Sequence, residues 1–342
     1  MAAKRLTKNP IALLGAKGDQ MKRRTFMGLV ASAVAWPLAA DAQQKRKWRI
    51  GFLHPGQSTL VSHRISALRE GLGKAGAADD VEILARIAND RPDLLPAMAA
   101  DLAKEGVHAI CAVAPLAVKA ARETTQSVPI IALDLESDPV ANGWVTSLAR
   151  PGGNITGIFL DLPNFSAKSL QLLREVVPGA AKIGVLWYPA SGTLQLDAAQ
   201  QAAAALSVEL QVFKVDKVAD FEAAFHGMTQ SQISGLLMLS APVFSGNPKI
   251  LGDLAILNRI PTINIFPDFA QNGGLIGYGP ELQSLFAQAG FLIGKVIGGA
   301  AIADLPVERP TRFRLIANLK TAHLIGVTVP TSILLLADEV IE

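Results

Sequence analysis

Arg49-Ile50-Gly51-Phe52-Leu53-His54-Pro55 has a counterpart later in the chain, Lys182-Ile183-Gly184-Val185-Leu186-Trp187-Tyr188-Pro189. Each copy is an apolar run that ends in a ring side chain, and Pro with a Gly or Ser turn then precedes a helical pattern. That order predicts a buried strand leading through a turn into a helix. Because the unit occurs twice, the sequence predicts two similar lobes.

Short β-rich runs alternate with helical patterns after each copy. Around the first copy we expect strands at 48–53, 81–87, 109–113 and 130–133 and helices at 59–72, 92–105 and 116–124. After the second we expect strands at 209–215, 235–239, 262–265, 274–278 and 312–316 and helices at 221–229, 249–257, 282–298 and 332–340. A spacing of about 25 residues between strands leaves room for one helix in each crossover. The fold class is therefore α/β, with two similar doubly wound parallel-sheet lobes.

A segment rich in turn formers, Ala149–Gly157, lies between the two series. It is either a loop tip or a crossing between the lobes, where the backbone must tolerate changes in angle. Its place at the repeat boundary favours the crossing.

The first 42 residues hold seven Lys or Arg and two Asp. Without them, 25 basic and 27 acidic residues remain, so the pI of about 9.0 reflects the leader and does not indicate a nucleic-acid partner. From Met21 a basic segment precedes the apolar run 26–35, Pro37 and the small-residue pattern Ala40-Asp41-Ala42, the order of a cleavable export signal.

This apolar run is too short for a stable membrane anchor, and no later stretch is long enough to insert the mature chain into a bilayer. Arg23-Arg24 before Thr25-Phe26 resembles the twin-arginine export motif, and an ordinary Sec signal is the alternative. Either signal, cleaved after about Ala42, places the mature chain in the periplasm.

Composition and motifs exclude several kinds of site. With 342 residues, 50% of them hydrophobic, the chain has enough apolar residues for one large or two medium cores. Its single Cys111 excludes a disulfide framework and a multi-thiolate metal site. The sequence contains no nucleophile elbow, phosphate loop or complete dinucleotide fingerprint. No metal site is predicted, because no metal-ligand spacing joins His54, His63, His108, His226 and His323. No cofactor is predicted either.

Three segments resemble one protein family. The most specific is Asp304–Ala322, which begins Asp-Leu-Pro-Val-Glu-Arg-Pro-Thr-Arg-Phe; Leu148–Gly157 and Tyr278–Leu282 support it. They resemble ABC-transporter substrate-binding proteins related to the tryptophan-binding component of tryptophan uptake systems. The resemblance covers about residues 48–342.

The resemblance implies a type I periplasmic-binding-protein fold, in which two α/β lobes joined by three crossing segments close on a ligand. The first lobe would take residues 48–155 and 283–305, and the second 160–278 and 312–342. The crossings would lie near 155–161, 278–282 and 307–313.

In open parallel sheets, ligands bind outside the carboxyl ends of the strands. Candidate residues therefore lie in the loops after the strands. Gln57, Ser58 and Ser191 could donate hydrogen bonds to a carboxylate beside free backbone N–H groups, although the serines are equally explained as helix caps. Pro115 belongs to another such loop, but Ala112–Pro115 lacks the Ser, Thr or Gly that the family often carries there. That difference weakens any transfer of ligand identity from the tryptophan binders.

Asp138, in a stretch that matches the family's Asp-Pro-Val, could pair with a ligand ammonium group or could simply initiate a turn. Rings at the strand ends could stack on an apolar or aromatic ligand, with core packing as the alternative. These rings belong to Tyr188, Phe244, Phe266 and Tyr278.

The sequence thus favours a non-enzymatic receptor for a small solute such as an amino acid or related carboxylate. The resemblance implies that it delivers the solute to a membrane permease powered by a cytoplasmic ATPase. An exported sensor module for a membrane receptor and an exported α/β enzyme are the alternatives.

Overall fold

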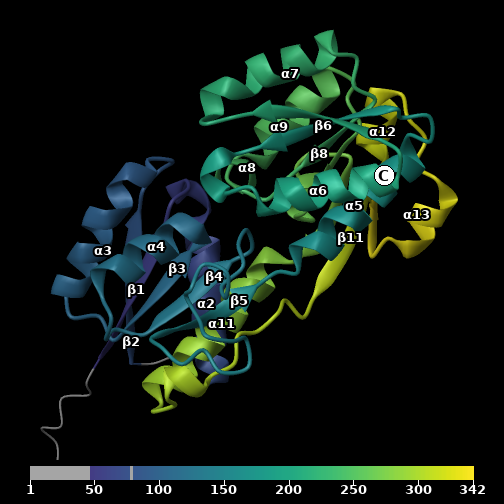
Figure 1. Cartoon of the computed structure of the whole chain (residues 1–342). Helices are drawn as coiled ribbons and strands as arrows, with labels where there is room; N and C mark the ends of the chain where they lie inside the picture. Colours follow the sequence, from purple (N-terminus) through teal and green to yellow (C-terminus); the bar gives the residue numbers. More distant parts are fainter. Residues whose placement is uncertain (1–46, 78–79) are drawn as a thin grey trace, which may run out of the picture. The chain divides into compact units, whose positions relative to one another are not determined.

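The structure is a computed structural model that describes residues 47–77 and 80–342. The leader predicted at 1–42 lies outside these residues. Within Lys47–Glu342 the strands form two separate sheets, each covered by helices on both faces (Figure 1). Among the residues described, no helix combines the length and apolar character needed to cross a membrane.

The first lobe contains a five-stranded parallel sheet in the order β2-β1-β3-β4-β5. Its strands are β1 (Trp48–His54), β2 (Val81–Ile87), β3 (Ala109–Val113), β4 (Ile130–Asp134) and β5 (Ile155–Phe159). Helices α2 (Val61–Lys74) and α11 (Leu282–Ile297) cover one face, and α3 (Leu95–Lys104) and α4 (Ala114–Thr124) cover the other. Short 3₁₀ turns occur at Ser58–Leu60, Pro92–Leu94 and Ile302–Asp304.

The second lobe contains a seven-stranded sheet in the order β12-β11-β10-β9-β8-β6-β7. Its strands are β6 (Lys182–Trp187), β7 (Glu209–Lys214), β8 (Gly235–Met238), β9 (Thr262–Asn264), β10 (Ile276–Pro280), β11 (Phe313–Asn318) and β12 (Glu339–Ile341). One face packs on α5 (Leu162–Val176), α6 (Leu194–Ala205), α12 (Leu319–Ile325) and α13 (Thr331–Leu336). The other packs on α7 (Phe221–Gln230), α8 (Pro242–Ser245), α9 (Pro248–Leu257) and α10 (Asp268–Gln271). 3₁₀ turns precede α6 and α7, at Pro189–Ser191 and Val218–Asp220.

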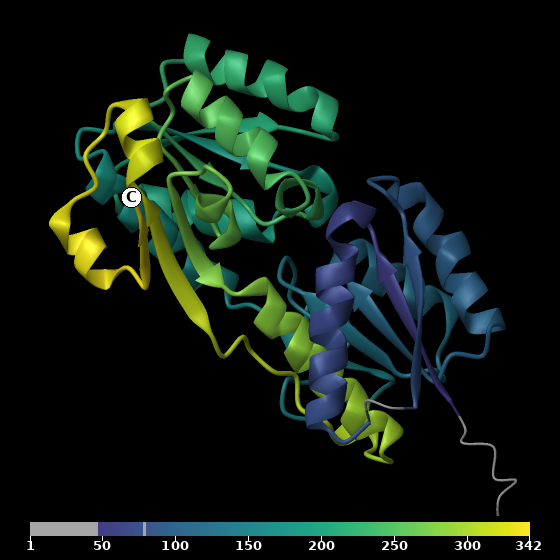
Figure 2. The same ribbon diagram turned by 180° about the vertical axis from the view of Figure 1, so that it is seen from behind.

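Helix α11 follows a strand of the second lobe but packs in the first, beside α2 (Figure 2). Glycines allow the two helices to approach closely. A Cβ atom at Gly71 would lie 1.8 Å from the carbonyl oxygen of Ala287, and one at Gly290 would lie 2.0 Å from that of Leu68. The backbones therefore touch where any larger residue would push them apart.

The chain passes between the lobes after β5, after β10 and before β11. Strand β5, at the start of the crossing predicted near 155–161, pairs with β4 over its whole length. In the third, Glu308 donates its N–H to the carbonyl of Gly157 at 2.8 Å before the chain continues into β11. Strand β11 runs antiparallel to β10, so the second sheet is not wholly parallel.

The predicted C-terminal helix at 332–340 is wrong in its second half. Helix α13 ends at Leu336, and β12 then pairs with β11. Asp338 lies between them, where its carboxylate accepts a hydrogen bond from the N–H of Leu315 at 2.8 Å and its own N–H donates to the carbonyl of Leu315. These side-chain and backbone hydrogen bonds to a neighbouring strand compete with continuation of the helix.

Candidate functional site

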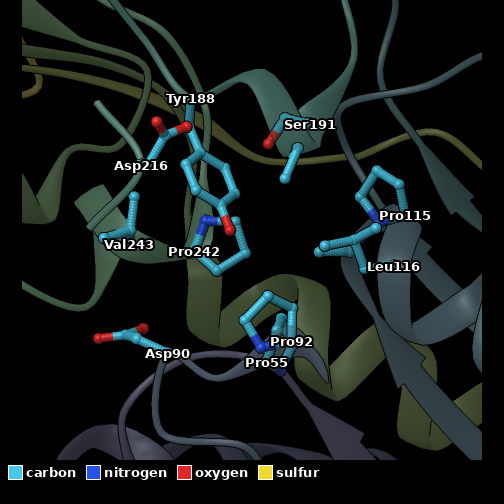
Figure 3. Close-up of a pocket in the computed structure, with 12 residues that line it drawn as sticks. Pro55, Asp90, Pro92, Pro115, Leu116, Tyr188, Ser191, Asp216, Pro242 and Val243 are labelled. Carbon is cyan, nitrogen blue, oxygen red and sulfur yellow. The ribbon is translucent and has the colours of Figure 1, made fainter. Parts of the chain in front are cut away.

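One cavity lies between the lobes, where loops after the strands of both sheets meet (Figure 3). We call it the outer compartment. Pro55, Asp90 and Pro115 come from the first lobe, after β1, β2 and β3; Tyr188 and Asp216 come from the second, after β6 and β7. Its remaining lining residues are Pro92, Ala114, Leu116, Ala190, Ser191, Pro242 and Val243. Both sheets thus present the carboxyl ends of their strands to one space, the position at which α/β sheets bind ligands.

A second cavity, the inner compartment, adjoins the first, because Ala114 and Pro242 line both. Most of its wall is apolar; Arg64 carries a charge, and the carboxyl of Glu136 has a pKa raised by burial. The other lining residues are His54, Val113, Leu133, Leu135, Ser245, Phe266, Leu282 and Phe286. A charged group entering this space would leave water for a medium of low polarity, where opposite charges attract more strongly.

Ala114, between the compartments, has φ +67° at the start of α4. A left-handed backbone is unfavourable for residues with a Cβ atom, by about 1–2 kcal/mol. Strain of this kind gathers at binding sites, where the surrounding structure holds it in place. The turn brings Pro115 and Leu116 to the outer compartment.

The outer compartment is acidic. Burial raises the pKa of Asp90, and the Gln57 side-chain amide, which donates a hydrogen bond to this carboxylate, opposes the rise. The pKa of Tyr188 is also raised, chiefly by burial and further by the charges of Asp90 and Asp216. Figure 3 shows the Tyr188 ring reaching into the space between the two lobes. Two carboxylates and a phenol could hold a cationic group beside an aromatic face.

A buried carboxyl pair lies at the end of β4. Asp134 Oδ1 accepts hydrogen bonds from the N–H groups of Glu136 and Ser137, at 2.9 and 3.2 Å. The Ser240 hydroxyl, in the second lobe, donates to Glu136 Oε1 at 2.6 Å. Gln195 on α6 exchanges two hydrogen bonds with the Ser240 backbone and so fixes its position. Burial raises the pKa of both carboxyls, and the charge of Asp134 raises that of Glu136 further.

Three of the predicted site residues line the outer compartment together: Pro115, Tyr188 and Ser191. Pro115 and Ser191 also border a neighbouring cavity with Asp138. Asp138 Oδ1 accepts hydrogen bonds from the N–H groups of Val140 and Ala141, at 2.8 and 3.1 Å. These bonds are those of a residue that initiates a turn. These contacts leave the ligand role of Asp138 as a prediction.

The predicted rings lie in different surroundings. Phe244 is only 2% exposed and packs against Phe221, at 6.0 Å between ring centroids, in the core of the second lobe. Tyr278 stacks on Phe165 at 5.1 Å, outside both compartments. Phe266 lines the inner compartment. Tyr188 is therefore the predicted ring that lines the outer compartment.

Gln57 and Ser58 lie at the edge of the site. The Gln57 side-chain amide donates a hydrogen bond to the Asp90 carboxylate, and the N–H of Ser58 donates to the side-chain oxygen of Asn89 at 3.0 Å. Ser58 is exposed and does not border either compartment.

Sequence reasoning missed Arg64, Asp90, Glu136 and Asp216 as individual site residues. For Arg64 a signal was present: the buried face of α2 contains Val61, Arg64, Ala67 and Leu68, so a charge interrupts an otherwise apolar helical stripe. Asp216 carries no such signal, because acidic residues after strands are common in ordinary turns.

The structure offers no metal centre in the part of the chain that it describes: it contains no group of three or more His, Cys, Asp or Glu able to hold an ion. Cys111 is buried in β3, and burial raises the pKa of its thiol to about 12.

Comparisons with known proteins agree with this architecture. A sequence model of the family described as ABC transporter substrate binding protein matches residues 54–341. A tyrosine-binding protein of Clostridioides difficile is 25% identical over 272 residues, which are 78% of this chain and 76% of that protein.

Two solved structures have the same fold. An ABC domain in complex with L-Trp from Streptococcus pneumonia matches with TM-score 0.78 and 23% identity over 86% of this chain and all of that one. A periplasmic solute binding protein of Actinobacillus succinogenes with bound D-allose matches with TM-score 0.57 and 14% identity, over 81% of this chain and 100% of that one. The predicted resemblance and the predicted two-lobed, periplasmic-binding-protein-like fold are both confirmed.

Proposed function

Because the chain belongs to the ABC transporter substrate binding protein family, we propose that it is the extracytoplasmic solute receptor of an ABC importer. Export by the leader signal delivers it to the periplasm. There it binds a small solute between its lobes and passes it, chemically unchanged, to a membrane permease driven by a cytoplasmic ATPase.

The observation that carries this proposal is the space lined by loops of both lobes, which consists of the outer compartment and the neighbouring cavity of about 570 Å³ that shares Pro115, Leu116 and Ser191 with it. A solute in this space contacts Pro115 and Leu116 on one side and Tyr188 and Ser191 on the other (Figure 3). A ligand shifts a conformational equilibrium only through its different affinity for the two states. Contact with both lobes supplies that difference, because opening the lobes removes the contacts with one of them.

We propose an amino acid or a related carboxylate as the solute. Asp90 and Asp216 suit an ammonium group, and the Tyr188 ring suits an apolar or aromatic side chain. The tyrosine and tryptophan named for two relatives support the same class.

The test is calorimetry and X-ray scattering on the purified chain with amino acids, small carboxylates and neutral sugars. We expect at least one amino acid to bind, to reduce the radius of gyration and to be recovered unchanged. At 100 times its Kd it should stabilise the chain by about 2.7 kcal/mol. Ser191→Trp should fill the outer compartment and abolish binding, whereas Leu257→Trp, at an exposed position on α9, should not. Turnover of the solute, or binding that Ser191→Trp leaves intact, would refute the proposal.

A further inference from the structure

Arg64 occupies an unfavourable position for a cation. It lies in the first turns of α2 with only 7% of its surface exposed. A positive charge near a helix N-terminus opposes the helix dipole, and a buried charge without a partner is costly. Burial lowers the pKa of Arg64 to about 10, which still leaves its guanidinium charged at neutral pH.

No carboxylate pairs with this guanidinium among the residues described. The Arg64 guanidinium contacts the His54 ring and lies over the face of Phe286, with its carbon 5.6 Å from the centroid of the Phe286 ring. Asp268, across the lobe boundary, acts on Arg64 through its charge but makes no ion pair with it. The positive charge therefore lacks a counter-charge in contact.

His54 cannot serve as the missing acceptor. Its Nδ1 accepts the N–H of Gly56 at 2.9 Å, and its Nε2 faces Nη1 of Arg64. Burial, and next the charge of Arg64, lower the pKa of His54 and keep the ring neutral. A neutral imidazole has one acceptor nitrogen, which Gly56 already uses, so Nε2 carries the hydrogen. Two donors, Nε2–H and the guanidinium, thus meet at the wall of the inner compartment.

We propose that the carboxylate of the solute binds in the inner compartment, accepting hydrogen bonds from the Arg64 guanidinium and from Nε2–H of His54. This inference rests on the proposed function and extends it to two residues that set the ligand class. One anion satisfies both donors and supplies the absent counter-charge. The apolar wall strengthens the pairing, since few other groups there compete for the charge.

The charges around the site suit a zwitterion. With the carboxylate at Arg64, the ammonium group would lie toward Asp90 and Asp216, which line the outer compartment, and the charge of Asp268 acts near Arg64 as well. A neutral sugar leaves the two donors unsatisfied, so the site discriminates against it.

The experiment compares wild type, Arg64→Leu and Arg69→Leu. Arg69 lies on the exposed side of the same helix, so its variant removes the same charge away from the cavity. The binding probes are L-tyrosine, L-tryptophan and their carboxamides, measured by calorimetry. We expect the carboxamides to bind wild type about 10- to 100-fold more weakly than the acids. Arg64→Leu should lose that preference, and Arg69→Leu should keep it.

A second measurement requires no amino-acid ligand. Thermal unfolding in sodium acetate, compared with sodium chloride at equal ionic strength, uses acetate as a minimal carboxylate. Acetate should raise the melting temperature of wild type and Arg69→Leu but not that of Arg64→Leu. In chloride, Arg64→Leu should melt above wild type, because it removes an unpaired buried charge.

The outcomes separate this inference from the proposed function. If no amino acid binds but acetate still protects only the chains with Arg64, the amino-acid proposal fails and the carboxylate site stands. If acids and carboxamides bind wild type equally, or if acetate gives no Arg64-dependent protection, the inference is overturned. A third result would also overturn it: Arg64→Leu and Asp268→Asn destabilise the chain equally, and the double variant is no less stable than either single variant. Arg64 would then be the structural partner of Asp268.

Discussion

The Ser240 hydroxyl donates a 2.6 Å hydrogen bond to Glu136 Oε1, and this bond joins the two lobes directly. Ser240 follows β8 of the second lobe, and Glu136 follows β4 of the first. Both side chains are buried, at 2% and 5% exposure. Separating the lobes therefore breaks the bond and returns both groups to water.

Ser240→Ala should weaken the contact between the lobes. It leaves a buried carboxyl oxygen without its donor, which costs about 1–3 kcal/mol. We expect faster hydrogen exchange at 136–138 and a larger radius of gyration. Ser245→Ala is the matched control, because the Ser245 hydroxyl donates to Pro242 within its own lobe. Equal behaviour of the two variants would contradict the assigned role of Ser240.

The stability of the chain should fall as pH rises above 4.5, the ordinary pKa of a glutamate carboxyl. Burial raises the pKa of Glu136, so the folded chain keeps a proton that the unfolded chain has already released. The stabilisation is complete below the unfolded pKa and is lost as pH passes the raised folded value. Urea unfolding across this range should show the decline in wild type and a weaker one in Glu136→Gln. Parallel curves for the two proteins would show that Glu136 is not responsible.

Gly290→Ala should destabilise the first lobe. The added Cβ meets the carbonyl oxygen of Leu68, a backbone atom that cannot move aside without shifting α2. Overpacking of this kind costs about 1–3 kcal/mol, measurable as a lower urea midpoint. Gly179→Ala is the control, because a Cβ there meets open space. A midpoint unchanged in Gly290→Ala would show that the two helices separate easily.

Ala114→Gly should stabilise the chain. Glycine adopts the left-handed backbone of this position without the Cβ penalty, and its larger unfolded-state entropy offsets part of the gain, leaving about 0.5–1 kcal/mol. Ala117→Gly, three residues further in the same helix and buried, should have the opposite sign. Denaturant unfolding of both variants checks the contrast, and destabilisation by Ala114→Gly would show that φ +67° is not strained.

Much of the fold could be predicted because local pattern and tertiary structure agree. The two strand-turn-helix units at Arg49 and Lys182 depend on buried apolar runs and on turn residues, which are visible in any sequence. The strand at Glu339–Ile341 was missed because a three-residue segment after a helix does not show its pairing partner, and β11 lies more than twenty residues earlier.

The sequence could predict which loops form the site, but not which of their side chains line it. Parallel strands end at the same edge, so the loops after β3 and β6 were expected to meet, and Pro115, Tyr188 and Ser191 do. Which side chain of a loop turns into the cavity depends on packing, so Phe244 instead entered the core. The carboxyl pair of Asp134 and Glu136 depends on burial by both lobes, a property of the folded chain alone.

The position of α11 has a consequence for biosynthesis. The strands of the first lobe leave the ribosome early, yet the helix that covers one of their faces is complete only at residue 297. Until then Phe52 and Leu68, which contact α11 in the finished protein, have no cover from it. During most of synthesis this apolar surface of the first lobe is therefore without the helix that covers it, and it is open to non-native contacts.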